Sequence, residues 1–150
     1  MNCRETTLAA CVVGNTRITI DDVVAIASRN VGVTLSDDPR FTRRINAGAN
    51  YLERLLADGG TIYGVTTGYG DSCTVAVPPE LIAELPLHLT RYHGCGLGEY
   101  LSPEAVRAVL VARIVSLAQG ASGVRRVLLE RLVDLLNHDL LPRIPAEGSV

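Results

Sequence analysis

The sequence of 150 residues contains no lysine, so its 14 basic residues are all arginine. It contains no tryptophan either. Without lysine, the chain cannot supply the phosphate-binding lysine of a P-loop or the Schiff-base lysine of a pyridoxal enzyme. Aromatic residues make up only 4% of the chain. Any chemistry here must therefore use groups other than lysine.

Cysteine is also sparse, with four residues at positions 3, 11, 73 and 95 and no CxxC pair. A zinc site needs clustered ligands, and a secreted disulfide scaffold is usually shorter and richer in cysteine. Long apolar runs are missing as well, because Arg107 and Arg113 interrupt the longest one at 105–118. We therefore expect a cytoplasmic protein with reduced thiols, no metal and no transmembrane segment.

The charge balance is close to neutral, since 14 basic and 16 acidic residues give a net charge of −2. Such a chain has no general attraction to nucleic acid or to anionic membranes. Hydrophobic residues make up 47% of the sequence, more than a soluble monomer requires. We expect one domain over residues 1–150, with part of its apolar surface buried against other subunits or further sequence.

Helical periodicity dominates the chain, and short strands are predicted only at 17–20 and 31–35. A capping box formed by Thr19 and Asp22 predicts a first helix that ends near Ser28. The segment Ser36-Asp37-Asp38-Pro39 predicts the start of a second helix, because it combines a capping side chain with proline in the first turn. That helix ends before Asp58-Gly59-Gly60, and its apolar stripe consists of Phe41, Ile45, Ala49, Leu52 and Leu56.

Two further helices are predicted near the end of the chain. The first begins at Ser102-Pro103-Glu104 and ends at Gly120, and it is apolar on nearly every face, as expected of a helix surrounded by protein. The second ends near Asn137-His138, and its apolar positions are Val124, Val127, Leu128, Leu132, Leu135 and Leu136.

The segment between Gly59 and Pro79 has no helical period and contains the motif Tyr63-Gly64-Val65-Thr66-Thr67-Gly68-Tyr69-Gly70. Segments of this length without regular structure are usually lids, binding loops or disorder. The three glycines of the motif allow a ligand to approach the backbone closely. A surface hairpin or Ω-loop with packed tyrosines explains the same pattern, and the residues alone leave both interpretations open.

His93 is the second candidate for a functional role. A helix predicted from Pro79-Glu80 places it on a buried stripe with Leu81, Leu85 and Leu89, although Pro86 would kink that helix or start it afresh. A lone histidine on such a stripe is more often a core residue bonded to backbone. The glycine cluster at 94–98, however, would leave the imidazole beside a space that a small ligand could fill.

The other polar candidates give weaker signals of function. Tyr92 faces either the same space or packed residues. We interpret His88 and His138 as surface or helix-end residues and Asp71 as a turn residue. Cys95 has no basic partner nearby in sequence that would activate its thiol.

At this level of detail the sequence resembles the aromatic amino acid ammonia-lyases, a family that comprises histidine, phenylalanine and tyrosine ammonia-lyases and the related 2,3-aminomutases. Four stretches carry the resemblance in order: YGVTTGYG at 63–70, LTRYHGCGLG at 89–98, RIVSLAQGASG at 113–123 and LLNHDLLPRIPAEGSV at 135–150. The similarity extends over most of the chain from about Ile18. It identifies residues 1–150 as the N-terminal portion of one ammonia-lyase catalytic domain.

The resemblance implies a mainly α fold with a few short strands and a long active-site lid loop, assembled as a homotetramer with active sites shared between subunits. It implies an enzyme of amino acid catabolism that needs no external cofactor, because the family forms a methylidene-imidazolone electrophile from its own Ala-Ser-Gly triad. By position, Tyr63 matches the catalytic base of the lid loop. His93 matches a residue that contacts the substrate side chain, and Tyr92 lies beside it as a further substrate-binding candidate.

In the family, the Ala-Ser-Gly triad follows shortly after the GSV that ends this chain, so the resemblance places the electrophile beyond Val150. The expected reaction is the non-oxidative deamination of histidine or tyrosine to ammonia and a trans-arylacrylate, either urocanate or 4-coumarate. An aromatic amino acid 2,3-aminomutase on the same scaffold is an alternative. A non-catalytic helical fragment that only assembles with partners is another.

Overall fold

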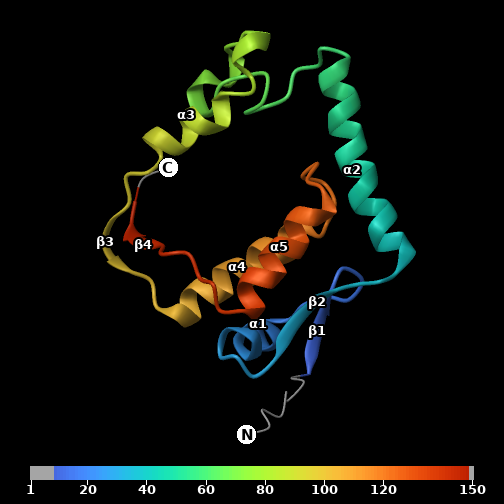
Figure 1. Cartoon of the computed structure of the whole chain (residues 1–150), viewed down its shortest axis with the longest axis vertical. Coiled ribbons are helices and arrows are strands. Elements are labelled where there is room, and N and C mark those ends of the chain that lie inside the picture. Colours follow the sequence, from blue (N-terminus) through green and yellow to red (C-terminus); the bar gives the residue numbers. More distant parts are fainter. Residues whose placement is uncertain (1–8, 149–150) are drawn as a thin grey trace, which may run out of the picture. The chain divides into compact units, whose positions relative to one another are not determined.

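The computed structural model describes residues 9–148, whose helices and strands are shown in Figure 1. Five α-helices dominate this part of the chain, joined by two 3-10 helices and four short strands. The mainly α fold predicted from the sequence is therefore confirmed. The chain divides into two compact units. We call Met1–Ala49 with Tyr100–Ile144 the core unit, and Asn50–Glu99 with Pro145–Val150 the site unit.

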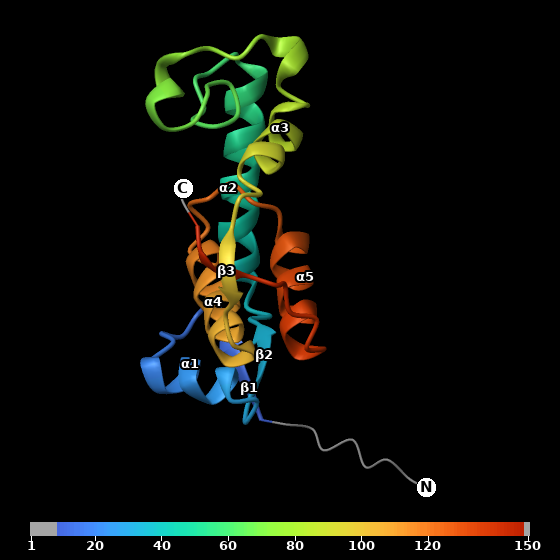
Figure 2. The same cartoon turned by 90° about the vertical axis from the view of Figure 1, so that its left-hand side faces the viewer.

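The core unit begins with two parallel strands that a helix connects. β1 (Ala10–Val13) pairs with β2 (Gly32–Leu35) in a register that places Ala10 opposite Gly32. Parallel neighbours need a crossover connection, which α1 (Ile20–Ala27) supplies (Figure 2). The predicted strand at 31–35 is confirmed by β2.

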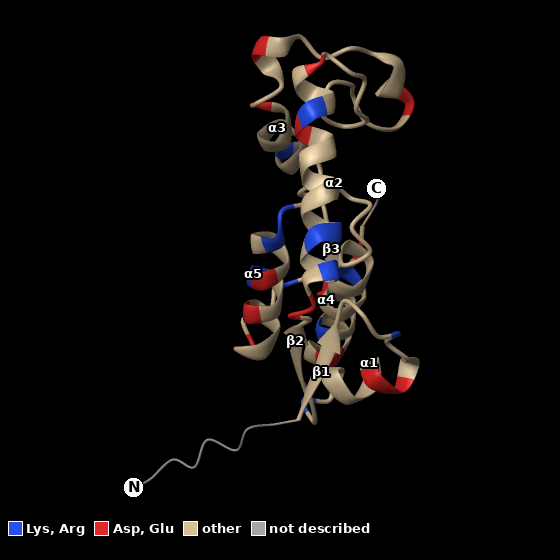
Figure 3. Ribbon diagram, turned by 90° about the vertical axis from the view of Figure 1, so that its right-hand side faces the viewer, with Lys and Arg blue, Asp and Glu red and all other residues tan. Residues whose placement is uncertain are grey.

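The predicted strand at 17–20 is wrong, because the chain is already helical from Ile20 onward. Thr19 decides this boundary: its hydroxyl accepts a hydrogen bond from the Asp22 N–H at 3.2 Å. The Asp22 carboxylate in turn accepts from the Thr19 N–H at 2.8 Å. The predicted capping box is thus confirmed, and it places two acidic residues in the first turn of α1 (Figure 3). The alternating pattern was misleading because Ile20 is 83% exposed.

Two ionisable side chains near β1 and β2 have shifted pKa values. The backbone and side-chain hydrogen bonds of Thr19 lower the pKa of Asp22. Burial raises the pKa of the Cys11 thiol on β1, and the negative charge of Asp22 adds to that effect. Cys11 is therefore held as the neutral thiol, consistent with a structural role.

α2 (Pro39–Ala57) begins where the sequence predicts. The Asp38 carboxylate caps it by accepting a hydrogen bond from the Arg40 N–H at 2.7 Å. The Ser36 hydroxyl accepts from the Asp38 N–H at 3.1 Å just before the first turn. The helix belongs to the core unit up to Ala49 and to the site unit from Asn50. Its apolar stripe is accordingly buried in the first half and becomes exposed along the second, in the order Phe41, Ile45, Ala49, Leu52 and Leu56.

α4 (Pro103–Leu117) and α5 (Arg126–Asn137) complete the core unit at the predicted positions. The Ser102 hydroxyl caps α4 by accepting from the Ala105 N–H at 3.2 Å. α4 is not surrounded by protein in this chain, contrary to the prediction, since one of its faces packs in the core while Val109 on another is 46% exposed. The core cluster contains Val13, Ile26, Val33, Phe41, Ile45, Leu110, Val111, Ile114, Leu117, Ala118, Leu129, Val133 and Leu136.

A buried arginine ties three segments of the core unit together. Arg107 on α4 is 5% exposed, and its guanidinium pairs with the Asp139 carboxylate just after α5. Its Nε also donates to the Ile26 carbonyl of α1 at 3.3 Å. The second Asp139 oxygen accepts from Arg29 at 2.8 Å, so one carboxylate serves two cations. A buried charge is tolerated here because it is both paired and hydrogen-bonded.

The site unit contains little regular structure. It holds the 3-10 helices η1 (Gly70–Thr74) and η2 (Pro79–Leu81) and the helix α3 (Leu85–Tyr92). The predicted helix from Pro79 is wrong in its start, because only a 3-10 turn forms there. Pro86 lies in the first turn of α3, where a missing N–H costs nothing, so the α-helix starts afresh at that point.

The structure contains two further short strands that the sequence analysis did not predict. β3 (Leu97–Tyr100) pairs with β4 (Pro145–Glu147) in a two-stranded sheet. All four residues of β3 are exposed, so they show no alternation of buried and exposed positions. A strand of this kind has no hydrophobic signature in the sequence.

Candidate active site

The lid segment 63–70 is folded by the side chains of two threonines. The Thr66 hydroxyl accepts from the Ile62 N–H at 2.7 Å and donates to the Gly60 carbonyl at 3.2 Å. Thr67 is 4% exposed, and its hydroxyl accepts from the Gly64 N–H at 3.3 Å. The loop is thus ordered by local hydrogen bonds of these two threonines. The sequence analysis assigned this role to neither residue.

Backbone pairing then closes the base of this segment. The Gly68 N–H donates to the Val75 carbonyl at 3.1 Å, and the Val77 N–H donates to the Thr66 carbonyl at 2.9 Å. Thr67 forms an antiparallel bridge with Ala76 on the same stretch. The predicted long loop between Gly59 and Pro79 is therefore confirmed as irregular, with the short helix η1 at its tip.

Tyr63 is exposed on this segment, and its phenol makes two defined contacts. Its oxygen accepts a hydrogen bond from the Gly70 N–H at 3.1 Å. Its ring meets that of Tyr69 edge to face, with centroids 6.2 Å apart and an interplanar angle of 90°. The hydrogen bond runs from one end of the YGVTTGYG motif to the other, so the motif itself holds the phenol in place.

His93 ends α3 and is exposed, so the prediction that it lies on a buried stripe is wrong. The physical reason is that α3 has no large body of protein packed over it in this chain, and even Leu85 and Leu89 are only half-buried. These three side chains nevertheless share one face of α3, and this face lines a hollow.

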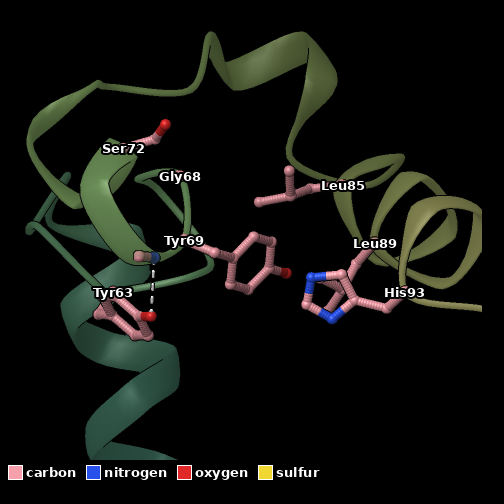
Figure 4. Close-up of a pocket in the computed structure, with 8 residues that line it drawn as sticks. Tyr63, Gly68, Tyr69, Ser72, Leu85, Leu89 and His93 are labelled. Carbon is pink, nitrogen blue, oxygen red and sulfur yellow. Dashed lines mark hydrogen bonds between the residues drawn. The ribbon is translucent and has the colours of Figure 1, made fainter. Parts of the chain in front are cut away.

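The hollow brings the two main candidate residues together. It has a volume of about 800 Å³ and lies within the site unit. Figure 4 shows Tyr63 on one side, the imidazole of His93 on the other, and the ring of Tyr69 between them. Its lining consists of Tyr63, Gly68, Tyr69, Gly70, Ser72, Leu85, Leu89 and His93. Two phenols, an imidazole and two leucines suit a small ligand with an aromatic ring.

Sequence reasoning missed Tyr69 and Ser72 as lining residues. The motif did contain Tyr69, and its position two residues before the predicted turn at Asp71 was the available signal. Ser72 gave no signal, because its place depends on the η1 turn. There its N–H donates to the Tyr69 carbonyl at 3.0 Å.

The remaining candidates whose side chains the structure describes do not line the hollow. The side chain of Tyr92 lies outside the described part of the structure, so its predicted role remains a prediction. His88 is close to Glu84 at 3.5 Å, and His138 ends α5, as expected for surface and helix-end residues. Asp71 lies in the η1 turn and Cys95 is exposed, and neither lines the hollow.

No group of three or more His, Cys, Asp or Glu side chains with metal-binding geometry occurs among residues 9–148. Within the same residues, none of the helices combines the length and the apolar character needed to cross a bilayer.

An Ala-Ser-Gly tripeptide does occur within the chain, at residues 121–123. It lies between α4 and α5 in the core unit, where Ser122 is exposed. None of its residues lines the hollow, which belongs to the site unit. This tripeptide is therefore distinct from the triad that the resemblance places beyond Val150.

Comparison with known proteins gives a consistent result. Residues 18–150 match the sequence profile of the family described as aromatic amino acid lyase. The histidine ammonia-lyase of Streptococcus pyogenes serotype M3 is 38% identical over 133 residues, which cover 89% of this chain and 26% of that protein.

Two solved structures show the same fold over nearly the whole chain. The tyrosine aminomutase from Streptomyces globisporus superimposes with a TM-score of 0.86 at 31% identity, covering 94% of this chain and 26% of its own. The phenylalanine aminomutase of Pantoea agglomerans gives a TM-score of 0.83 at 30% identity, covering 95% and 27%. This chain thus spans about a quarter of the length of the relatives it matches.

Proposed function

Because this chain belongs to the aromatic amino acid lyase family, we propose that the full-length protein removes ammonia from L-histidine or L-tyrosine and releases urocanate or 4-coumarate. The observation that carries this proposal is that Tyr63 and His93, the two residues singled out by the family resemblance, line one hollow. The sequence identity of 38% with a histidine ammonia-lyase supports a carbon–nitrogen lyase reaction.

Tyr63 is assigned the role of the base that takes a proton from the β-carbon of the substrate. The Gly70 N–H donates to its oxygen at 3.1 Å, which fixes where that oxygen lies. None of the residues that line the hollow is acidic. With 64% of its surface exposed in this chain, Tyr63 is accessible to a substrate in the hollow.

His93 is assigned to the ring end of the substrate. An imidazole can donate or accept a hydrogen bond, so it suits both the imidazole of histidine and the phenol of tyrosine. Leu85 and Leu89 lie on the same face of α3 and supply apolar contact for the ring. Replacing His93 with Phe should shift preference towards phenylalanine, because a phenyl side chain makes apolar contact with a plain ring and offers no hydrogen bond to an imidazole or a phenol.

A base alone does not suffice for this reaction, since the β-proton is weakly acidic and the amine is a poor leaving group. In the family, a methylidene-imidazolone ring supplies the electron sink. The lining of the hollow is compatible with such an electrophile, because it contains no thiol or amine that would add to it. The chain has no lysine, and neither Cys73 nor Cys95 is a lining residue.

An aromatic amino acid 2,3-aminomutase is the second candidate, and a specific observation favours it. The solved structures that superimpose well on this chain include tyrosine and phenylalanine aminomutases. A mutase would use the same Tyr63 and His93 but would return ammonia to the β-carbon before the acrylate leaves. It would therefore need to keep the site closed for longer than a lyase does.

The proposal extends to a cytoplasmic homotetramer whose active sites are completed by other subunits. Large apolar side chains remain exposed on α1 and α4 in this chain, at Ile20, Val24 and Val109. Exposed apolar surface of this kind is often covered in an assembly. Sedimentation velocity of the full-length protein should give the mass of a tetramer, and a monomer would contradict this part of the proposal.

The decisive experiment is product analysis with the full-length protein. L-histidine, L-tyrosine and L-phenylalanine are supplied in turn, and products are separated by chromatography while acrylate is followed by ultraviolet absorbance. Ammonia with an arylacrylate supports the lyase, a β-amino acid supports the mutase, and no product from any substrate refutes both. A Ser122→Ala variant is the matched control, and it should form product normally because Ser122 is exposed and lies outside the hollow.

A further inference from the structure

Tyr69 is a residue to which the proposed mechanism gives no role, although it lies between the two residues that have one. It is half-buried and lines the hollow. Figure 4 shows its ring between Tyr63 and His93, with its phenol oxygen directed towards the imidazole of His93. The same side chain thus contacts Tyr63 through its ring and faces His93 with its hydroxyl.

The backbone of the lid segment fixes where this ring lies. A Cβ atom at Gly64 would lie 2.6 Å from Cε1 of Tyr69, so the ring packs directly on the glycine. A Cβ at Gly68 would lie 2.7 Å from the Cβ of Ser72, so the turn after Tyr69 is equally tight. These close approaches leave Tyr69 little freedom, and its position is a built feature of the motif.

Because the Tyr69 ring packs closely on Gly64, the position of its phenol oxygen is fixed as well. Leu85 and Leu89 are the other described side chains that line the hollow from α3, and both are apolar. Among the described side chains, the polar groups at that end are therefore the Tyr69 hydroxyl and the His93 imidazole. A phenol both donates and accepts hydrogen bonds, so it can orient an imidazole in either tautomer.

We infer that Tyr69 is a positioning residue for substrate selectivity, whose hydroxyl orients the His93 imidazole so that the two act as one polar recognition unit. The inference rests on the proposed function, because it specifies how that same site would discriminate between rings. A substrate with a phenol or an imidazole gains from an oriented His93. A substrate with a plain phenyl ring does not.

The test uses Tyr69→Phe in the full-length protein, because this change removes the hydroxyl and keeps the ring that packs on Tyr63. For the preferred polar substrate, kcat/KM should fall about tenfold through KM, the effect of one hydrogen-bonded contact, while kcat stays near the wild-type value. For phenylalanine, kcat/KM should not fall. Tyr51→Phe is the matched control, since Tyr51 is 61% exposed and does not line the hollow.

A double-mutant cycle separates positioning from simple packing. If Tyr69 acts through His93, then Tyr69→Phe should have no further effect on selectivity in a His93→Phe background. Equal effects of Tyr69→Phe in both backgrounds, or an unchanged selectivity in the single variant, would overturn the inference.

The inference and the proposed function fail in different ways. If the wild-type protein turns over none of the three amino acids, the proposed function is refuted, and the same cycle is then read from their dissociation constants by calorimetry. Binding of histidine or tyrosine that is weakened by Tyr69→Phe only when His93 is present upholds the positioning role. Binding that ignores Tyr69→Phe, or no binding of any of the three, overturns it.

Discussion

The core unit and the site unit are stabilised by different kinds of interaction. Every member of the hydrophobic core cluster lies in the core unit, on β1, β2 and four of the helices. In the site unit, among the residues whose burial is described, only Ile62 and Thr67 are buried. The site unit is instead ordered by hydrogen bonds of Thr66 and Thr67 and by tight turns at glycine.

This difference indicates how stability and function are divided along the chain. Segments with few buried apolar contacts open at low free-energy cost, which is a common property of loops that admit ligands. The core unit holds the hydrophobic core cluster and contributes no lining residue of the hollow. Substitutions in the two units should therefore separate into those that change unfolding and those that change catalysis.

The largest effect is expected from Tyr63→Phe in the full-length protein. Loss of a general base typically costs about a hundredfold or more in rate, and here the phenol oxygen is the group that takes the proton. The side chain is 64% exposed, so the thermal midpoint should stay at the wild-type value. Turnover is measured by acrylate absorbance and folding by circular dichroism; near-normal turnover would remove Tyr63 from the mechanism.

Asp139→Asn should do the opposite, lowering stability with little change in kcat. It leaves the Arg107 guanidinium buried without its carboxylate, and breaking a buried pair in this way costs about 3 kcal/mol. Asparagine tolerates the positive φ of 60° at this position, so the backbone is not the cause. The thermal midpoint is the measurement.

The matched control for Asp139→Asn is Asp134→Asn, which breaks an ion pair with Arg131 that is exposed on both sides. An exposed pair of this kind contributes less than about 1 kcal/mol. Equal losses in both variants would show that burial of Arg107 does not matter.

Gly64→Ala and Gly59→Ala sharpen the comparison within the site unit. Both glycines have φ near +70°, so each substitution should cost about 1 kcal/mol of backbone strain. Nothing lies within 4 Å of a Cβ at Gly59, whereas a Cβ at Gly64 would collide with Tyr69. Only Gly64→Ala should therefore lose turnover, measured as kcat/KM, and equal activity in both variants would contradict the packing of Tyr69 on Gly64.

Thr19→Ala should give the smallest effect, confined to the stability of the core unit. Removing an N-cap side chain costs about 1 kcal/mol, because a helix N–H loses its acceptor. The Thr19 N–H and hydroxyl also donate to the Asp22 carboxylate and lower its folded pKa below the unfolded value. The stability that these two bonds add is present above the unfolded pKa and disappears as pH falls through the folded one, and Thr19→Ala removes only the share of the hydroxyl.

The difference in thermal midpoint between wild type and Thr19→Ala should accordingly be smaller in acid than at neutral pH, while the bond from the Asp22 N–H keeps it above zero. A difference that persists unchanged at acid pH would show that the bond from the Thr19 hydroxyl to the Asp22 carboxylate contributes nothing to stability.

The sequence by itself determined the helices whose ends carry chemical signals. Thr19, Asp38 and Ser102 each accept a backbone hydrogen bond from the first turn of a predicted helix, because capping depends only on residues a few positions away. The motif at 63–70 and His93 were also identified in advance. Tyr63 of this motif and His93 line one hollow, while their roles in catalysis and substrate binding remain predictions.

Tertiary structure alone decided which strands pair, how far each apolar stripe is buried, and which side chains complete the hollow. β1 and β2 form because parallel pairing brings together segments that flank α1, and no local pattern encodes that pairing. His93 is exposed and Tyr69 lies between it and Tyr63 because of how α3 and the η1 turn are placed. Capping is a property of neighbours in sequence, whereas burial and the shape of a site depend on contacts between segments far apart in the chain.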